Sequence, residues 1–426
     1  EPFALMAEPS HAEVTVRAHT PAAFESLLKI GATLTITCTH GGSARTLYTG
    51  TLRRVTPQGG MYGVRTVTLE AFGLEDALSR TAVRLPLLVN STPSDIVAIA
   101  LNALSEPPPL SLLDSSRLVL AYVGDTWGES VTGAQVIRDA VEAERGRFFV
   151  TRDGAAVFFN RQHLLTTASP PVTLTDAFES LTMKHAGGLR EVRVNIMPRA
   201  LGADNATLWT LTGALPIRAG ASDCTVRFTG SGQRIGAAVV LDPISGVDYM
   251  ANTQADGTGA SVTEQVSVTL GQTTATTARL LFHNTSGGTA YLLPGARLKG
   301  TPLLRGDALT VRAAESADAA RLGGVTLAPA LLDSVTDAEH IARYTLDLSS
   351  APQTHITHAT LNQQAGFAAG LVLTLFDAVR LRETLTAHDA VYHIVGEAHT
   401  VTRGGASHRI TWTLEPIDTR PYWAVG

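Results

Sequence analysis

The stretch YHIVGEAHTVTRGGASHRITWTLE, residues 392–415, consists of two runs of β-strand composition separated by a Gly-Gly pair. A similar stretch, LYTGTLRRVTPQGGMYGVRTVTLE, occupies residues 47–70. The Gly-Gly pairs and the closing Thr-Leu-Glu triplets lie 345 positions apart, whereas Gly50 and Gly396 lie 346 apart. The match predicts two copies of one β-hairpin that differ by one residue in the turn. The alternative is chance similarity, because strand–Gly-Gly–strand hairpins are common.

On this match Leu69 corresponds to Leu414 and Gly60 to Gly405. A true duplication predicts two β-modules of the same fold and strand order in one chain. Homo-oligomers usually close into symmetric rings, so three such chains would provide six similar positions around one axis.

Composition limits the class of protein. The 426 residues are enough for roughly three or four domains. With 44% hydrophobic and 17% charged residues, the chain is expected to fold around packed cores. A net charge of -5 argues against a general nucleic-acid binder. No apolar run approaches the roughly 20 residues that span a bilayer, so we expect no stable membrane insertion.

Residues 11–85 predict a first β-barrel-like domain. Polar and apolar residues alternate from Thr33 to Thr39, which is typical of a half-buried strand. The segment 57–60 predicts the turn of the first hairpin. We expect strands within 186–200 to complete this domain.

Residues 86–185 predict a small α/β domain. Thr92 before Pro93 predicts a helix start, and a second helix is expected from Gly133 to Arg145. Asp-Gly at 153–154 lies between two apolar runs and predicts a two-residue type I′ hairpin turn.

Residues 203–302 predict an inserted β-sandwich. The segment is rich in Thr, Gly and Ser, and short strand-like runs recur along it. It separates the strand-like runs 192–196 and 309–312, so we interpret it as an insertion between two strands of one module. We expect it on the outside of any assembly.

Residues 303–426 predict a second β-barrel-like domain. A helix is expected within 328–348 and a long strand pair within 371–385, followed by the second copy of the hairpin. The predicted fold is therefore mainly β with an α+β module: two similar β-barrel-like domains, a small α/β domain and an inserted β-sandwich.

Thirteen histidines invite a metal-site interpretation. His355 and His358 would share a face only on a helix, and their segment is typical of a strand. On a strand His393 and His399 are expected to share a face, with His408 across from one of them. No third ligand lies near His355 and His358. For the C-terminal set, which also includes His388, we predict solvated or hydrogen-bonded sheet histidines, so no metal site is expected.

Catalytic motifs are also missing. The sequence has no nucleophile elbow, phosphate loop, dinucleotide fingerprint or His-Glu-x-x-His. Asp176 and Glu179 can share a face, which is typical of a solvated surface, and Glu142 and Glu144 are expected to face different directions. We predict no catalytic residues, no cofactor and no enzymatic activity.

Two further sets of residues have ordinary explanations. Cys38 and Cys224 fall in different predicted domains, so no disulfide is predicted. The triplets that begin at Asn90, Asn205 and Asn284 match the glycosylation pattern, but such triplets arise by chance in a Thr-rich chain.

The order of these pieces resembles the tail hub proteins of tailed bacteriophages, also called tail-associated or baseplate hub proteins. Four stretches carry the resemblance: the hairpin 48–72, the helix and hairpin 133–159 with the run ERGRFFVTRDGAAVFFNR, the run LREVRVNIMP at 189–198, and the C-terminal stretch 376–416. The insert departs from the pattern. So does the lack of a recognisable lytic or peptidase domain, which puts a wall-degrading role in doubt.

The resemblance implies a homotrimer in which two β-barrel-like domains per chain alternate around an axis. Such a pseudo-sixfold ring would join the tail tube to the tail tip of the virion and let DNA pass during genome ejection. The implied partners are the distal tail ring protein, the tape measure protein and tail-tip or fibre proteins.

Two other classes remain open. The insert could make the chain a carbohydrate-binding protein of the virion or cell surface, although its few aromatics lie in strand patterns that predict core packing. A secreted hydrolase has no supporting constellation of residues. A threefold ring would favour the hub, and a monomer would favour the other two classes.

Overall fold

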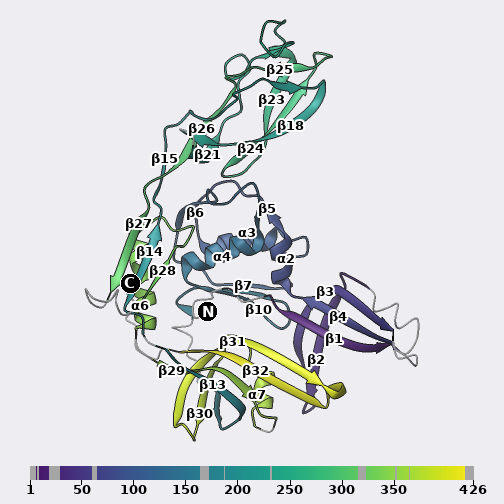
Figure 1. The fold of residues 1–426 in the computed structure, drawn as a ribbon, viewed down its shortest axis with the longest axis vertical. Helices are drawn as coiled ribbons and strands as arrows, with labels where there is room; N and C mark the ends of the chain where they lie inside the picture. The colour runs from purple at the N-terminus through teal and green to yellow at the C-terminus, as the bar shows by residue number, and fades with distance from the viewer. Residues whose placement is uncertain are drawn as a thin grey trace.

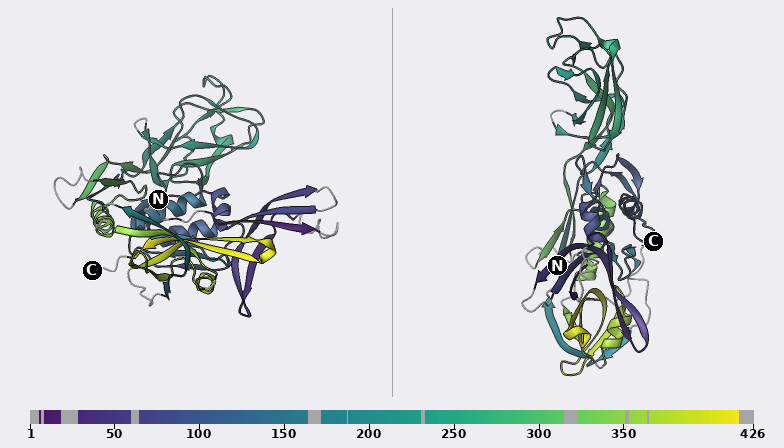
Figure 2. Two further views of the ribbon diagram at one scale, coloured as in Figure 1. Left: turned by 60° about the horizontal axis from the view of Figure 1, so that its bottom comes forward. Right: turned by 90° about the vertical axis from the view of Figure 1, so that its right-hand side faces the viewer.

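The computed structural model describes residues 6, 9–18, 29–59, 65–163, 172–186, 188–230, 233–314, 323–350, 353–363 and 365–417. The molecule is elongated, with the insert at one end, a helical module in the middle and two β-structures at the other end (Figures 1 and 2). Strands dominate throughout, so the predicted mainly-β fold is confirmed. No helix in the described residues is both long and apolar enough to cross a membrane.

The first β-structure, which we call the N-terminal sheet, has four antiparallel strands in the order β1-β4-β3-β2. Their bounds are β1 His11–Ala18, β2 Thr33–His40, β3 Ser43–Gly59 and β4 Arg65–Phe72, followed by α2, Leu74–Arg80. The expected turn at 57–60 instead begins with strand residues, because β3 continues to Gly59. Gly60, and with it the predicted match to Gly405, lies outside the described residues.

The second β-structure, which we call the C-terminal barrel, has the strand order β12-β30-β31-β32-β29-β13. The bounds are β12 Val172–Thr175, β13 Phe178–Ala186, β29 Gln353–Leu361, β30 Ala378–Glu383, β31 His388–Thr402 and β32 Ser407–Pro416. β12 is parallel to β30, and the chain of antiparallel pairings makes β13 run in that same direction. Only two residues separate β12 from β13. They therefore form one kinked strand that pairs with both ends of the sheet and closes it (Figure 2, right).

The kink is fastened to both neighbouring strands. Asp176 has a φ of 48°, a left-handed conformation that Asp tolerates better than most residues. Its amide donates to the Arg382 carbonyl at 3.0 Å, and its carboxylate accepts from the amide and hydroxyl of Thr384 at 3.0 and 2.9 Å. The carbonyl of Ala177 accepts from the Asn362 amide at 3.0 Å. These bonds hold the point at which the strand passes from β30 to β29.

The middle module contains the two predicted helices. They are α3, Pro93–Asn102, and α4, Gly133–Glu144. Thr92 accepts from the Asp95 amide and the Asp95 side chain bonds back, which forms a capping box. Short strands surround the helices: β5 Ala82–Val83, β6 Leu88–Ser91, β7 Ser111–Leu113, β8 Leu120–Val123, β9 Val131–Thr132, β10 Arg147–Val150 and β11 Ala156–Phe159.

The predicted hairpin is present as β10 and β11, but its predicted type I′ turn is wrong. Positive φ occurs at Gly154, 87°, and not at Asp153. The Thr151 amide donates to the Ala155 carbonyl at 2.9 Å, so the loop has three residues with glycine in the left-handed position. The longer loop places Arg152 at its start.

A third sheet joins segments that are far apart in sequence. β14, Glu191–Ile196, lies between β27, Leu309–Ala314, and β28, Gly324–Leu327. Its residues Val192 and Val194 are buried in one core with Ile341 of α6, Val335–Ser349. The three strands β27, β14 and β28 therefore pack on the same core as α6.

This pairing corrects three predicted boundaries. Strands within 186–200 do not complete the first β-module, because β14 pairs with β27 and β28. β27, β28 and α6, which fall in the predicted range 303–426, pack with the middle module and not with the barrel. β12 and β13, which fall in the predicted range 86–185, belong to the barrel.

The insert has a core of its own, drawn from three sheets. Its main strands are β15 Arg199–Leu201, β16 Ala206–Thr210, β17 Leu215–Ile217, β18 Gly220–Arg227, β21 Gly236–Val240, β22 Ala251–Asn252, β23 Val266–Thr273, β24 Thr277–Asn284, β25 Ala290–Leu292 and β26 Arg297–Arg305. The flanking strands β14 and β27 pair antiparallel along their length. The chain therefore leaves and returns at one place, as an insertion requires.

The strand pair predicted within 371–385 is wrong in its first half. Residues 371–372 end a short helix, α7, Phe367–Val372, residues 373–377 are in neither a helix nor a strand, and only β30 is a strand. A Cβ at Gly370 would lie 2.7 Å from side-chain atoms of both Leu361 and Ile410. Glycine at this position therefore lets the helix backbone approach the barrel closely.

Candidate functional site

The N-terminal sheet has the same strand order as four of the six strands of the barrel. The sheet reads β1-β4-β3-β2, and the last four strands of the chain read β29-β32-β31-β30. Counted from the first strand of each, both orders are 1-4-3-2, and every pair is antiparallel. The predicted similarity of the two modules therefore holds for these four strands of each, although the modules have other bounds than predicted.

The residue-for-residue match between the modules is wrong in register. Leu69 lies opposite Val55 in the first hairpin. On the sequence match Leu414 should lie opposite Val401, but its partner is Ile394. The predicted equivalence of Leu69 with Leu414 therefore fails.

Two pairs of cross-strand threonines give a consistent alignment of the two modules. Thr15 of β1 lies opposite Thr68 of β4 with the hydroxyls 3.3 Å apart, and Thr360 of β29 lies opposite Thr411 of β32 with the hydroxyls 3.1 Å apart. Aligned on these pairs, β4 and β32 are 343 positions apart instead of 345. A shift of two residues keeps each side chain on its face of the sheet, because strand side chains alternate with a period of two.

The longer strand of each hairpin supports this alignment. The pairing register shifts directly after Leu52 in β3 and directly after Ile394 in β31. Leu52 lies opposite Ala71, and Ile394 lies opposite Leu414. Ala71 and Leu414 are equivalent when the modules are aligned on the threonine pairs. The register shifts of β3 and β31 therefore fall at equivalent positions.

The N-terminal sheet packs against the barrel. Leu47 of β3 is buried in the barrel core, and Ile36 of β2 packs on the same core. At the end of β2 the His40 ring contacts Phe367 of α7 edge-on, and Phe367 contacts His408 in the same way, with centroids 5.2 and 5.1 Å apart. The two related modules therefore meet inside one chain.

His393 and His399 do not share a face, contrary to the prediction, because the register shift lies between them. His393 lies opposite Glu415, whereas His399 lies opposite the buried Ile410. The Nδ1 of His393 is 3.0 Å from the Phe376 carbonyl. Burial lowers the pKa of His393.

His408 contacts His399, as predicted for one of the two histidines. The Nδ1 of His399 lies 2.9 Å from the Nε2 of His408, and its Nε2 lies 3.8 Å from a Glu397 oxygen. Burial, and then the neighbouring His399, lower the pKa of His408. Among the described residues no three His, Cys, Asp or Glu side chains are grouped for a metal ion.

Arg152, in the loop of the β10–β11 hairpin, joins the middle module to the barrel. Its guanidinium bonds Glu397 at 2.6 Å and donates to the carbonyls of Gly370, Leu371 and Leu373 at 2.9–3.1 Å. These carbonyls end α7 and have no partner within the helix. Burial opposes ionisation of Glu397, but the bonds from Arg152 and His399 hold its pKa below the usual value.

A second contact lies at the other end of the hairpin. The Nη2 of Arg147 donates to both carboxylate oxygens of Glu415, at 2.7 and 2.9 Å. The rings of Phe149 and Phe159 both pack on Phe376, with centroids 4.7 and 5.9 Å away. The run ERGRFFVTRDG, which carried part of the resemblance, therefore docks one module on another.

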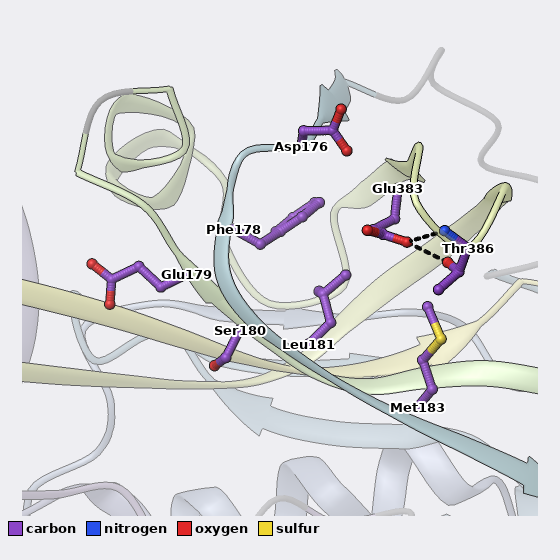
Figure 3. Close-up of a pocket in the computed structure, with 8 residues that line it drawn as sticks. All are labelled: Asp176, Phe178, Glu179, Ser180, Leu181, Met183, Glu383 and Thr386. Carbon is purple, nitrogen blue, oxygen red and sulfur yellow. Dashed lines mark hydrogen bonds between the residues drawn. The ribbon is translucent and has the colours of Figure 1, made fainter.

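A hollow of about 450 Å³ lies beside the kinked strand. It is lined by Asp176, Phe178, Glu179, Ser180, Leu181, Met183, Glu383 and Thr386 (Figure 3). Phe178, Leu181 and Met183 point towards the β30–β31 turn, whereas Glu179 points away and pairs with Arg409 at 3.2 Å. Asp176 was predicted as solvated surface, and its role in closing the barrel gave no signal in the sequence.

The base of the insert is held to the middle module by a buried carboxylate. Asp125 pairs with Arg199 at 3.0 Å and with Arg305 at 2.8 Å, one arginine from each strand that enters or leaves the insert. The Arg199 side chain is 1% exposed and donates to the carbonyls of Ala330 and Leu331. This network orients the insert relative to the helices.

The aromatics of the insert pack inward. Phe228, Tyr249 and Phe282 are buried in its core, and Trp209 packs against the same core. Tyr291 is half-buried. The described part of the insert therefore offers no fully exposed aromatic ring for stacking on a sugar.

Two acidic residues of α4 are buried, which the sequence did not indicate. Glu144 is 2% exposed, and burial raises its pKa to about 7. Asp139 accepts from Trp127 Nε1 at 2.7 Å and from the side-chain Nε2 of Gln135 at 2.6 Å. Both residues belong to the middle module.

The remaining residues from the sequence have structural roles. Cys38 and Cys224 are free and half-buried. Asn284 is 2% exposed and donates to the Ile217 carbonyl at 2.9 Å, so this triplet is unsuited to glycosylation. His355 and His358 lie on strand β29, as expected.

Comparisons with known proteins agree with this architecture. No protein-family model and no curated protein matches the chain. Its structure is similar to the 43 kDa tail protein of prophage MuSo2 from Shewanella oneidensis, with a TM-score of 0.51 and 10% identity over 97% of this chain and 92% of that chain.

Two further solved structures are similar at lower scores. The tail protein from Neisseria meningitidis MC58 has a TM-score of 0.46 and 11% identity, covering 95% of this chain and 91% of that chain. The prophage tail protein gp18 from Listeria monocytogenes EGD-e has a TM-score of 0.37 and 8% identity, covering 89% and 82%. The likeness to the MuSo2 protein shows that this chain has the fold of a prophage tail protein, which confirms the predicted resemblance at the level of fold.

Proposed function

We propose that this chain is a structural tail hub of a bacteriophage-type particle. Three copies form a ring in which the N-terminal sheet and the C-terminal barrel alternate around the axis. The observation that carries the proposal is the shared strand order 1-4-3-2 with equivalent threonine pairs. Two related modules per chain let a trimer present six similar positions.

The differences between the modules fit the same role. One is closed by the kinked strand, and the other is an open sheet whose apolar residues enter the barrel core. A ring of three closed and three open modules has sixfold similarity and threefold symmetry. Such a ring can join a sixfold tube to a threefold tip.

The partners follow from that position at the tail tip of the virion. They are the distal tail ring protein on one side and tail-tip or fibre proteins on the other, with the tape measure protein and then DNA passing through. Tight phosphate contacts would hold a passing strand, and the net charge of -5 is consistent with a lumen that does not bind DNA tightly.

We also propose that the chain has no intrinsic catalysis and that the N-terminal sheet, middle module, insert and barrel act as four domains. The separate cores of the insert and the barrel support this division. The insert, held at its base by Asp125, projects away from the two ring modules (Figure 1). It would therefore lie outside the ring.

Native mass spectrometry and electron microscopy of the purified chain test the proposal. We expect a particle with three times the 44.8 kDa chain mass and averages with threefold symmetry and six inner lobes. A chain that stays monomeric at tens of micromolar, or a ring with another symmetry, would contradict it. Deletion of residues 203–302 is the matched control, since the ring should survive and lose three outer projections.

A further inference from the structure

Strand β13 keeps one edge free. Within the described residues β13 pairs with β29 alone. β12 follows β30 only as far as Arg382, after which the kink at Asp176 carries the strand over to β29. The edge of β13 beyond the kink therefore faces the β30–β31 turn across the hollow of about 450 Å³ (Figure 3).

The floor of the hollow is apolar. Phe178, Leu181 and Met183 lie at the margin of the barrel core, each half-buried, and point into the hollow. They occupy one strand over six positions, so the apolar floor is elongated along the strand. That shape suits an extended chain better than a compact small molecule.

The rim of the hollow is acidic. The carboxylates of Asp176 and Glu383 bond hydroxyl and amide groups of Thr384 and Thr386, and no ion pair joins either of them to a described lysine or arginine. These hydrogen bonds hold the pKa of Glu383 below its usual value, so it is ionised at neutral pH. The hollow therefore carries negative charge that no described basic side chain neutralises.

We propose that the free edge of β13 and the adjoining hollow bind an extended, basic segment of a partner protein as an added strand. The backbone of the segment pairs with the edge of β13. Its alternate side chains fill the hollow over Phe178, Leu181 and Met183, because strand side chains alternate between faces. A lysine or arginine of the segment lies beside Asp176 and Glu383. This proposal does not rest on the proposed function.

A random octapeptide library is the probe. The full chain and its Leu181→Asp variant are screened side by side, and retained peptides are resynthesised for titration calorimetry. We expect wild type to retain peptides in which apolar residues alternate with lysine or arginine. Backbone N-methylation at alternate residues should reduce their affinity at least tenfold, because it removes the pairing donors.

Two further variants keep the test independent of folding. Glu383→Gln preserves the hydrogen bonds in the turn and should weaken basic peptides about three- to tenfold, as expected for loss of a charge-assisted contact. Glu13→Gln, an exposed position on the N-terminal sheet, is the matched control and should leave the affinity unchanged. Equal unfolding midpoints exclude a folding defect as the cause.

Three results would overturn the proposal. One is that wild type retains no peptide better than Leu181→Asp. Another is that acidic peptides bind as well as basic ones, or that Glu383→Gln and Glu13→Gln behave alike. The third is that the edge is covered by a second copy, in which case amide exchange in β13 would slow with protein concentration and peptides would not compete.

Discussion

The N-terminal sheet and the C-terminal barrel reach the same strand order with very different cores. In the described residues the sheet has its own small cluster of Leu52, Val67 and Leu69. The barrel surrounds a large cluster that includes Tyr392 and Trp412. Strand order therefore depends little on core size, and the smaller module relies on its neighbour for stability.

The largest expected effect contrasts the two cores at equivalent positions. Trp412→Ala should lower the free energy of unfolding by about 3–5 kcal/mol, because it empties a fully buried site in the barrel. Leu69→Ala, at the position equivalent to Trp412, should cost about 2 kcal/mol, at the low end for a buried leucine. Urea unfolding of the full chain, followed by circular dichroism and by amide exchange in each module, measures both.

Amide exchange supplies the decisive control. Leu69→Ala should speed exchange in the N-terminal sheet and leave the barrel protected. If both modules open together in both variants, they form one cooperative unit and the contrast between them is wrong.

A second prediction concerns the clamp between the barrel and the middle module. Arg152→Ala should cost about 3 kcal/mol, since it leaves Glu397 buried without its partner and frees the carbonyls that end α7. Thermal unfolding and a double-mutant cycle with Glu397→Gln measure it. A coupling energy near zero would show that the pair contributes nothing to the contact.

A third prediction concerns the pH dependence of stability, which should differ between the barrel and the middle module. Burial lowers the folded pKa of His393 and His408, both in the barrel. The unfolded chain, with histidine near pH 6.5, therefore binds more protons than the folded chain below that pH. Stability is fully present above about pH 6.5 and falls as the pH drops through the folded pKa values.

The measurement has to be local, because Glu144 acts in the opposite direction. Its raised pKa of about 7 makes the middle module gain stability as the pH falls from about 7 towards the unfolded value of 4.5. Amide exchange corrected for intrinsic rates should show the barrel opening more at pH 5.5 than at pH 7.5. His408→Gln should reduce that difference, and an unchanged difference would remove His408 from the explanation.

The smallest effect tests the equivalence of the threonine pairs. Thr68→Val and Thr411→Val should each cost about 0.5–1 kcal/mol through loss of one cross-strand hydrogen bond. Double-mutant cycles with Thr15→Val and Thr360→Val should give couplings of the same sign. Opposite signs would end the argument that the pairs are equivalent.

Local signals in the sequence predicted local structure well. Thr92 and Pro93 predicted the start of α3, and the Asp-Gly pair at 153–154 predicted the hairpin, although not its loop length. These features depend on residues close in sequence, where capping and turn conformations dominate. The composition break at the insert was also visible, and its flanking strands do pair.

Long-range pairing was predicted poorly because few local residues encode it. The matching triplets at Leu69 and Leu414 pointed to the right strands in the wrong register, and a shift of two residues leaves the burial pattern unchanged. Nothing near β12 and β13 indicated that their partners lie near the C-terminus. The roles of Asp176 and Arg152 depend on that pairing, so the sequence missed both.

The kinked strand has a consequence for the order in which the protein can be made. Asp176 emerges from the ribosome long before Thr384, its partner 208 residues later in the chain. Until then β12 lacks its partner β30, and β13 can pair only once β29 has been made. Unpaired strand edges invite aggregation. Barrel closure is therefore a late step in biogenesis, possible only when synthesis is nearly finished, and a product truncated before β30 would leave β12 without its partner strand.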